Sequence, residues 1–336
     1  MRPISTRRSL LRTTGGLAAI LATGKAPAFA QAQPKKLQIA AVNPVPESGA
    51  IALEFLAKQL TERTKGELDV TYHGGTLLTK EIDIMNAVKA GNIAIGNPGG
   101  ASATVFPEMG VFLVGYLIGS YDQAYKILNG KVGEDLDKTF QEKYGLKVLY
   151  YFDYGFRHVW NAKRQVSTPR DLRGLKIRVQ PSKVFADTVS SLGAVAVPLG
   201  WAEVITAAQQ GVIDGADLPV VNMVPLKAYE VSKYYALTGH NYGATLIAMN
   251  LAMFNALTPA QQKLVIDTSR EAQGVVRNVT ESVDTLENAK KQLEPLGMSV
   301  VQPDPAPFID LARQKLWPIY EKQYSGLWEQ IVSTKA

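Results

Sequence analysis

The chain has 336 residues, a formal net charge of +6, three histidines and no cysteine. The absence of cysteine excludes thiol nucleophiles, disulfides and cysteine-ligated metals. The histidines, at positions 73, 158 and 240, lie about eighty residues apart and show no metal-binding spacing. We therefore expect neither a metal nor another cofactor.

The first thirty residues have the features of a cleaved export signal. A basic start with Arg7-Arg8 precedes a short apolar run, and Ala28-Phe29-Ala30 fits the small-x-small cleavage pattern. The arginine pair favours the twin-arginine route, with an ordinary Sec signal as the alternative. Removing residues 1–30 takes away five basic and no acidic side chains, so the net charge falls from +6 to +1. We therefore expect a periplasmic protein, with no nucleic acid and no direct membrane insertion.

Strands and helices alternate through the first part of the remaining chain, which predicts a largely parallel α/β sheet. The expected strands are Lys36–Val42, Leu68–Tyr72 and Ile93–Ile95, and the expected helices are Ser48–Arg63 and Lys80–Ala90.

The middle of the chain repeats this order. Strands are expected at Leu175–Val179, Ala194–Val197 and Val212–Ile213, and helices at Ser182–Leu192 and Trp201–Gln210. Residues 87–93 and residues 207–213, which lie 120 positions apart, have a similar local sequence. In both segments a helix is expected to end at a glycine, directly before a strand. The repeat predicts two lobes of similar build that face each other across a cleft.

A long helix is expected to begin at Thr258-Pro259, where a threonine cap, a first-position proline and Gln261 form a strong start signal. It could run some 35 residues, roughly 50 Å, and bridge both lobes, with a possible break at Gly274. A final helix over about Phe308–Ser333 should pack its aromatic residues into the core. The first lobe then comprises 36–154 plus about 244–284, and the second 155–243 plus about 285–336.

Arg178 is the most informative polar residue. The strand Leu175–Val179 alternates, so Lys176 and Arg178 share one face. Open α/β sheets bind ligands beyond the carboxyl ends of their strands, and a guanidinium there can hold a carboxylate through two parallel hydrogen bonds. A surface ion pair is the alternative.

Several segments resemble one known family. The stretches GLKIRVQPS, GAVAVPLGWAEVITAAQQGVIDGAD and KAYEVSKYYALTGHNY are similar to the C4-dicarboxylate-binding type of solute-binding subunit in tripartite ATP-independent periplasmic (TRAP) transporters. The resemblance implies a two-lobed, type II-like periplasmic binding protein that serves a membrane permease. It also implies that Arg178 forms the main salt bridge with a substrate carboxylate, that Arg157 supports it, and that Trp201 lines the pocket.

One segment departs from the family pattern. Many members read D-G-x-E-N-P where this chain has Asp214-Gly215-Ala216-Asp217-Leu218-Pro219. Leu218 replaces an amide by an aliphatic group, which favours an aromatic or branched 2-oxo or hydroxy acid over a hydroxyl-rich sugar acid. The alternative is that other side chains supply the hydrogen bonds, so that the ligand is a hexuronate or a C4-dicarboxylate. The candidate ligand-binding residues are Arg178, Arg157, Trp201, Leu218, Asp217, Asn43, Asn97, Gly99 and Tyr242.

Two other classes of function are alternatives. A periplasmic enzyme exported in folded form could use His158, beside Arg157, as a general base, and a scaffolding module would also explain export. The chain has no Gly-x-Gly-x-x-Gly after a strand, no P-loop, no Gly-x-Ser-x-Gly and no His-Glu-x-x-His motif. We therefore expect a binding protein with no catalytic residue.

Overall fold

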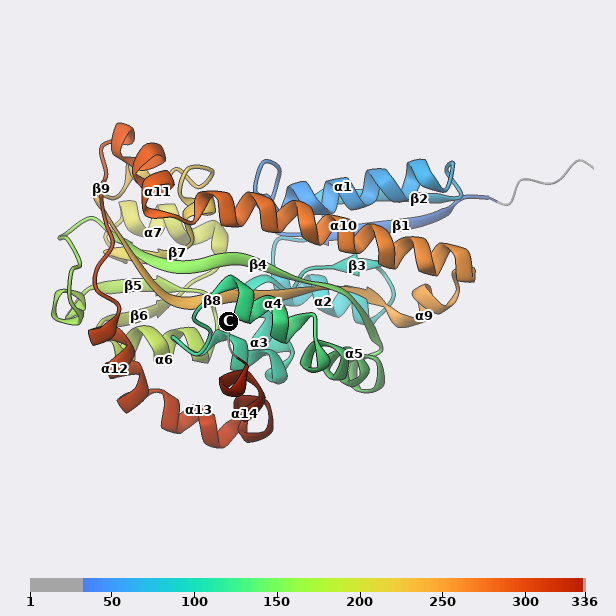
Figure 1. The fold of residues 1–336 in the computed structure, drawn as a ribbon. Helices are drawn as coiled ribbons and strands as arrows, with labels where there is room; N and C mark the ends of the chain where they lie inside the picture. The colour runs from blue at the N-terminus through green and yellow to red at the C-terminus, as the bar shows by residue number, and fades with distance from the viewer. Residues whose placement is uncertain (1–32, 335–336) are drawn as a thin grey trace, which may run out of the picture. The chain divides into compact units, whose positions relative to one another are not determined.

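The computed structural model describes residues 33–334, and the expected export signal lies outside them. A nine-stranded sheet runs through the described residues in the order β2-β1-β3-β8-β4-β7-β5-β6, with β9 paired to β8 (Figure 1). The strands are β1 Lys35–Ala41, β2 Leu68–Gly74, β3 Ile95–Gly96, β4 Leu146–Asn161, β5 Lys176–Val179, β6 Val195–Pro198, β7 Gly215–Leu218, β8 Tyr234–Asn250 and β9 Ser299–Val301. The α-helices are α1 Ser48–Arg63, α2 Glu81–Lys89, α3 Ser102–Val105, α4 Tyr121–Leu128, α5 Lys131–Tyr144, α6 Lys183–Ser191, α7 Val204–Gln209, α8 Val220–Met223, α9 Leu251–Asn255, α10 Pro259–Val283, α11 Leu286–Leu293, α12 Ala306–Lys315, α13 Trp317–Gln323 and α14 Ser325–Ser333.

Each lobe has a parallel arrangement of strands at its centre. In the first lobe β1 pairs in parallel with β2 and β3, and in the second lobe β5 pairs in parallel with β6 and β7. Helix α1 has the bounds predicted from the sequence and buries Leu53, Leu56 and Leu60. This confirms the α/β fold class.

The repeat at an offset of 120 is confirmed by matching hydrogen bonds. The amides of residues 92 and 93 both donate to Ala87 O, and those of residues 212 and 213 both donate to Ala207 O. Because these amides still bond to the helix, the strands begin only at Ile95 and Gly215. The strand expected at 212–213 was therefore wrong by three residues.

Two long antiparallel strands carry the sheet from one lobe to the other. Strand β8 pairs with β3 near Met249, and β4 pairs with β7 between His158 and Asn161. The pairing of β4 with β8 is irregular between Asp153 and Phe156, where Gly155 has a φ of +85°. Neither strand was predicted at this length from the sequence.

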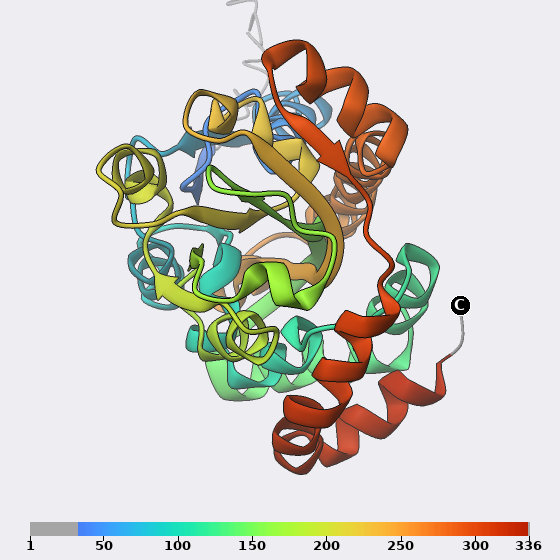
Figure 2. The ribbon, with the colours of Figure 1, turned by 90° about the vertical axis from the view of Figure 1, so that its left-hand side faces the viewer.

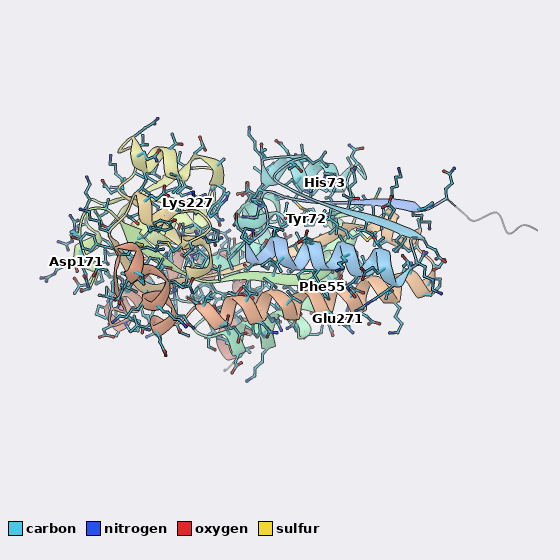
Figure 3. All side chains as sticks on the ribbon, turned by 90° about the horizontal axis from the view of Figure 1, so that it is seen from above. Phe55, Tyr72, His73, Asp171, Lys227 and Glu271 are labelled. Carbon is cyan, nitrogen blue, oxygen red and sulfur yellow. The ribbon has the colours of Figure 1, made fainter. Side chains whose placement is uncertain are left out.

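Helix α10 contacts α1 of the first lobe, strand β4, and α8 and α11 on the side of the second lobe, so the expected bridging helix is present (Figure 1). Figure 3 shows Phe55 on α1 and Glu271 on the neighbouring α10, where Arg63 donates to both carboxylate oxygens of Glu271 at 2.7 Å. The expected length was wrong. The helix passes through Gly274 and ends at Val283, and Thr285 caps a separate helix, α11.

The single final helix that we expected was wrong, because this segment forms three helices, α12 to α14. They are drawn in red in the lower right of Figure 2. The first break falls next to Pro318, whose ring nitrogen has no hydrogen to donate to the preceding turn. The aromatic residues pack as predicted. Tyr320 is buried and its hydroxyl donates to Asp187 in the second lobe, while Trp317 Nε1 donates to Gly115 O.

Candidate functional site

Arg178 lies at the carboxyl end of β5 with only 1% of its surface exposed. Its Nε donates to Leu199 O at 2.9 Å, but Nη1 has no hydrogen-bond partner among the described residues. Burial lowers the pKa of this guanidinium to about 10. Because a buried charge with an unpaired donor is costly, Arg178 is a candidate to bind an anion, and its burial excludes the surface ion pair that was the alternative.

Arg157 lies on β4 and is already paired. Its Nε and Nη2 donate to the two carboxylate oxygens of Asp217 on β7, at 2.7 and 2.9 Å. Burial alone would raise the pKa of Asp217, but the Arg157 guanidinium outweighs it and holds that pKa at about 2. Because Nε and Nη2 of Arg157 already donate to Asp217, Arg157 can add positive charge at the site but has fewer free N–H donors than Arg178.

A small cavity of about 20 Å³ lies between residues of both lobes and is lined by Arg157 but not by Arg178. Its lining residues are Val42, Asn43, Glu81, Gly99, Tyr154, Arg157, Gln180, Trp201, Leu218 and Asn222. A space of this size holds about one water molecule, so a solute can reach the site only if the lobes separate. Contacts across the cleft agree with a closed form, because Thr104 Oγ1 donates to Pro181 O and an added Cβ on Gly100 would meet Gln180 at 1.6 Å.

The structure brings most of the candidate residues together. Five of them line the cavity, namely Asn43, Gly99, Arg157, Trp201 and Leu218. Three others stand directly behind that lining. Asp217 accepts hydrogen bonds from Arg157, and Asn97 Oδ1 accepts one from the backbone amide of Gly99. Arg178 is close enough to Glu81 to influence its pKa.

Tyr242 is the candidate that the structure does not bring to the cavity. Its ring packs against Phe156 and Tyr121, with centroids 5.4 and 6.1 Å away. These two aromatic neighbours line a separate hollow, which also includes His158 and Asp284. Tyr242 therefore belongs to a different cluster of side chains.

Five lining residues were not predicted from the sequence, namely Val42, Glu81, Tyr154, Gln180 and Asn222. Val42 and Gln180 directly follow β1 and β5, so the rule that ligands bind beyond the carboxyl ends of strands could have found them. Tyr154 and Asn222 lie on β4 and on the four-residue helix α8, neither of which was expected.

Two carboxylates, the partly buried Glu81 and the buried Glu47, lie on the first-lobe side of the site. Burial raises the pKa of Glu81, which lines the cavity. Burial also raises the pKa of Glu47, at the start of α1, to about 7. The site therefore has guanidinium groups on the second-lobe side and carboxylates on the first-lobe side.

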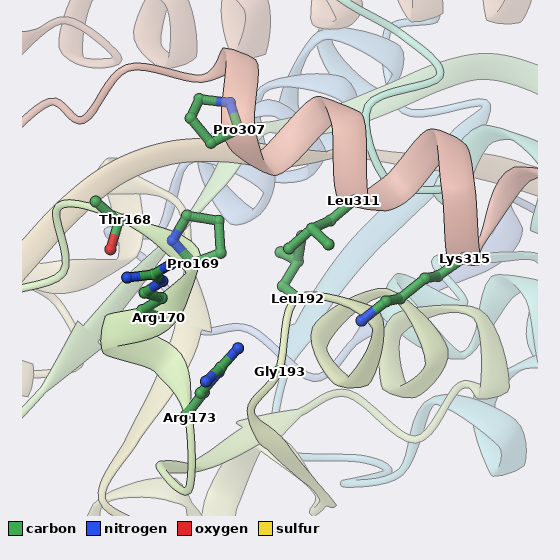
Figure 4. A pocket seen from close by; sticks show the side chains of 9 residues that line it. All are labelled: Thr168, Pro169, Arg170, Arg173, Leu192, Gly193, Pro307, Leu311 and Lys315. Carbon is green, nitrogen blue, oxygen red and sulfur yellow. The ribbon is translucent and has the colours of Figure 1, made fainter.

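A larger hollow of about 520 Å³ lies on the second lobe, between the 168–173 turn, the end of α6 and helix α12 (Figure 4). Its basic side chains, Arg170, Arg173 and Lys315, are all exposed. Exposed cations are screened by water and salt, so each would hold an anion less firmly than a buried guanidinium. The cavity beside Arg178 is the better candidate for the solute.

A two-lobed α/β fold that closes over a buried guanidinium with a spare donor defines a protein that binds an anionic solute. The chain belongs to the bacterial extracellular solute-binding proteins, family 7, whose family model matches residues 40–326. A curated relative in Escherichia coli is the 2,3-diketo-L-gulonate-binding periplasmic protein. It is 35% identical over 227 residues, which cover 67% of this chain and 69% of the relative.

Solved structures are similar over most of the chain. One is a TRAP periplasmic solute-binding protein from a Bordetella species with density attributed to pantoate, at 28% identity and a TM-score of 0.83. Another, from Citrobacter koseri, holds D-glucuronate, at 26% identity and a TM-score of 0.81. Each similarity covers 90% of this chain and 100% of the other. This chain is therefore a TRAP-type solute-binding protein and not an enzyme.

Proposed function

We propose that this protein binds a hydroxylated sugar acid in the cavity between its lobes and delivers it to a TRAP permease. The observation that carries the proposal is the buried Arg178, whose Nη1 has no partner among the described residues. Its charge acts on Glu81, which lines the same cavity as Arg157. A carboxylate accepts two hydrogen bonds from such a fork, and burial makes the pairing strong. Arg157 adds positive charge behind the same carboxylate.

The rest of the ligand would extend toward the first-lobe side of the cavity. Glu81 and Asn43 offer oxygen acceptors there, Asn222 offers another from the second lobe, and these acceptors suit the hydroxyl groups of a sugar acid. Trp201 and Leu218 supply an apolar wall that can pack against the carbon–hydrogen face of a sugar chain. Leu218 by itself favoured an aromatic or branched acid. The acceptors around it favour the alternative that other side chains satisfy the hydroxyls.

The named ligands of similar proteins support the same choice. The Escherichia coli relative is named for a diketo sugar acid, and the Citrobacter structure holds a hexuronate. The Bordetella structure, with density attributed to pantoate, indicates that a branched hydroxy acid also suits this fold.

Titration calorimetry with D-glucuronate, D-gluconate, pantoate and phenylpyruvate would test the proposal. We expect saturable binding without turnover, with the sugar acids tighter than phenylpyruvate. Tighter binding of phenylpyruvate would return the assignment to an aromatic acid, and no binding by any carboxylate would overturn the proposal altogether. Thermal shifts provide an independent readout, because a ligand that binds only the folded state stabilises it by RT ln(1 + [L]/Kd).

A further inference from the structure

A chain of buried hydrogen bonds crosses the cleft behind the cavity and ends on Glu47. Asn43 Nδ2 donates to Glu47 Oε2 at 2.6 Å, and Asn222 Nδ2 donates to the same oxygen at 3.0 Å. Glu47 and Asn43 belong to the first lobe and Asn222 to the second. One carboxylate oxygen therefore joins the two sides of the closed cleft.

The direction of every hydrogen bond in this network follows from the carboxylate of Glu47. Above a pH of about 7 Glu47 is ionised and its carboxylate can only accept, so both asparagines turn their NH2 groups toward it. Asn43 Oδ1 is then free to accept from the Tyr154 hydroxyl at 3.2 Å. The Tyr154 oxygen in turn accepts from Asn97 Nδ2 at 3.3 Å. The usual ambiguity between the oxygen and nitrogen of an asparagine amide is removed here by chemistry.

The hydrogen bond to Glu47 determines which polar atoms of Asn222 are free to face the cavity. Its side chain lines the cavity, and with one N–H of Nδ2 donated to Glu47 the carbonyl oxygen is turned away from that carboxylate, while the second N–H is not used by Glu47. Glu81 lines the same region and contributes a carboxylate. The part of the wall formed by Asn222 and Glu81, which we call the far wall, therefore presents a carbonyl acceptor and negative charge, whereas the arginines present donors and positive charge.

We propose that Glu47 is a specificity-determining residue that touches no ligand but sets the polarity of the far wall, so that the site accepts one carboxylate and hydroxyl donors and rejects a second carboxylate. This inference rests on the proposed sugar-acid function. A second carboxylate placed against Glu81 and the Asn222 carbonyl would meet the negative charge of Glu81 and that of Glu47 behind Asn222. A hydroxyl in the same place donates a hydrogen bond.

D-gluconate and D-glucarate form a matched pair for the test, because they differ only in the last carbon, which is a hydroxymethyl group in one and a carboxylate in the other. The titrations are done at pH 8, above the pKa of Glu47. We expect the unmutated protein to bind gluconate at least about tenfold more tightly than glucarate. The Glu47→Gln variant should narrow that ratio severalfold, because the new amide can donate and lets Asn222 turn its NH2 group toward the cavity.

Glu54→Gln is the control, since it removes the same charge from an exposed position on the same helix and should leave the ratio unchanged. Glu47→Gln is nearly isosteric and replaces a buried charge by a neutral amide, so the variant should fold, which circular dichroism checks. Asn222→Leu is a second variant, and it should weaken gluconate binding more than glucarate binding. An unchanged ratio in a folded Glu47→Gln variant, or equal narrowing by Glu54→Gln, overturns the inference. Failure of the unmutated protein to bind gluconate, glucarate, D-glucuronate or any other carboxylate would instead refute the proposed function.

Discussion

The two arginines of the site are both buried, yet their hydrogen bonds give them different roles. Arg157 donates to the carboxylate of Asp217. Arg178 donates through Nε to the carbonyl of Leu199, and its Nη1 has no hydrogen-bond partner among the described residues. Asp217 in turn lies 3.7 Å from the ring Nε2 of the buried His240. We therefore expect a solute carboxylate to accept from the free donor on Arg178, with the paired Arg157 as a fixed positive charge beside it.

Arg178→Lys should weaken solute binding by about 1.5–3 kcal/mol, the range for hydrogen bonds to charged groups. Lysine keeps the charge but loses the planar fork. Titration calorimetry with the best sugar acid measures the change. Arg170→Lys, at an exposed arginine of the surface hollow, is the matched control and should bind like the unmutated protein. Equal affinities for the Arg178 variant and the control would remove Arg178 from the site.

Asp217→Asn should destabilise the fold by about 3–5 kcal/mol, because it leaves the buried Arg157 guanidinium without its partner. Urea unfolding of the protein without solute measures this loss. Asp267→Asn removes a partly exposed carboxylate that pairs with Lys263 on α10 and should leave the unfolding midpoint nearly unchanged. If the two variants unfolded alike, the Arg157–Asp217 pair would have no special structural role.

At the scale of elements, the crossing strands and the bridging helix decide where the lobes can move. Strand β4 is irregular between Asp153 and Phe156, and the end of α10 lies beside this point. There Asp284 accepts from the amide of Phe156 at 3.0 Å and contacts His158 Nε2 at 2.8 Å. We expect the hinge of closure to lie here, since this is where the regular pairing of the long strands is interrupted.

Two glycines in these elements should respond in opposite ways to alanine. Gly274 lies inside α10, and apart from the adjoining helix backbone no described atom lies within 4 Å of an added Cβ, so Gly274→Ala should stabilise the protein by about 0.5–1 kcal/mol. Gly155 has a φ of +85°, and an added Cβ would lie 2.7 Å from the Tyr121 hydroxyl, so Gly155→Ala should cost at least about 1 kcal/mol. Denaturant unfolding of the two variants tests both signs, and a stabilised Gly155 variant would contradict the assigned backbone.

For the molecule as a whole, stability should depend on pH through Glu47. Burial raises its pKa in the folded state to about 7, above the 4.5 of an unperturbed glutamate. The folded protein then holds this proton more strongly than the unfolded chain, so the contribution is present near pH 4.5 and is lost as the pH rises through about 7. The buried His240 acts in the opposite direction, because burial lowers its pKa.

Comparison with Glu47→Gln isolates the glutamate from the other titrating groups. Between about pH 5 and pH 8 the unmutated protein should lose about 2 kcal/mol more unfolding free energy than this variant, in which position 47 cannot titrate. Urea unfolding at both pH values measures the difference. Parallel pH profiles for the two proteins would show that Glu47 titrates normally.

Local sequence signals determined much of the architecture. Alternating strands and helices, the glycine-terminated repeat, and the Thr258-Pro259 cap predicted the α/β lobes and the start of the bridging helix, because each signal acts within a few residues of backbone. The same signals placed Arg178 at the end of a strand, where solutes bind.

Tertiary structure decided the rest. It ended α10 at Val283, where Asp284 bonds to residues of β4, and it drew β4 and β8 into long strands through pairing across about ninety residues of sequence. It also brought Asn222 against Glu47, 175 residues apart, and so set the direction of the hydrogen bonds behind the cavity. No local pattern encodes such a contact, because a buried polar group is satisfied by whichever partner the folded chain places beside it.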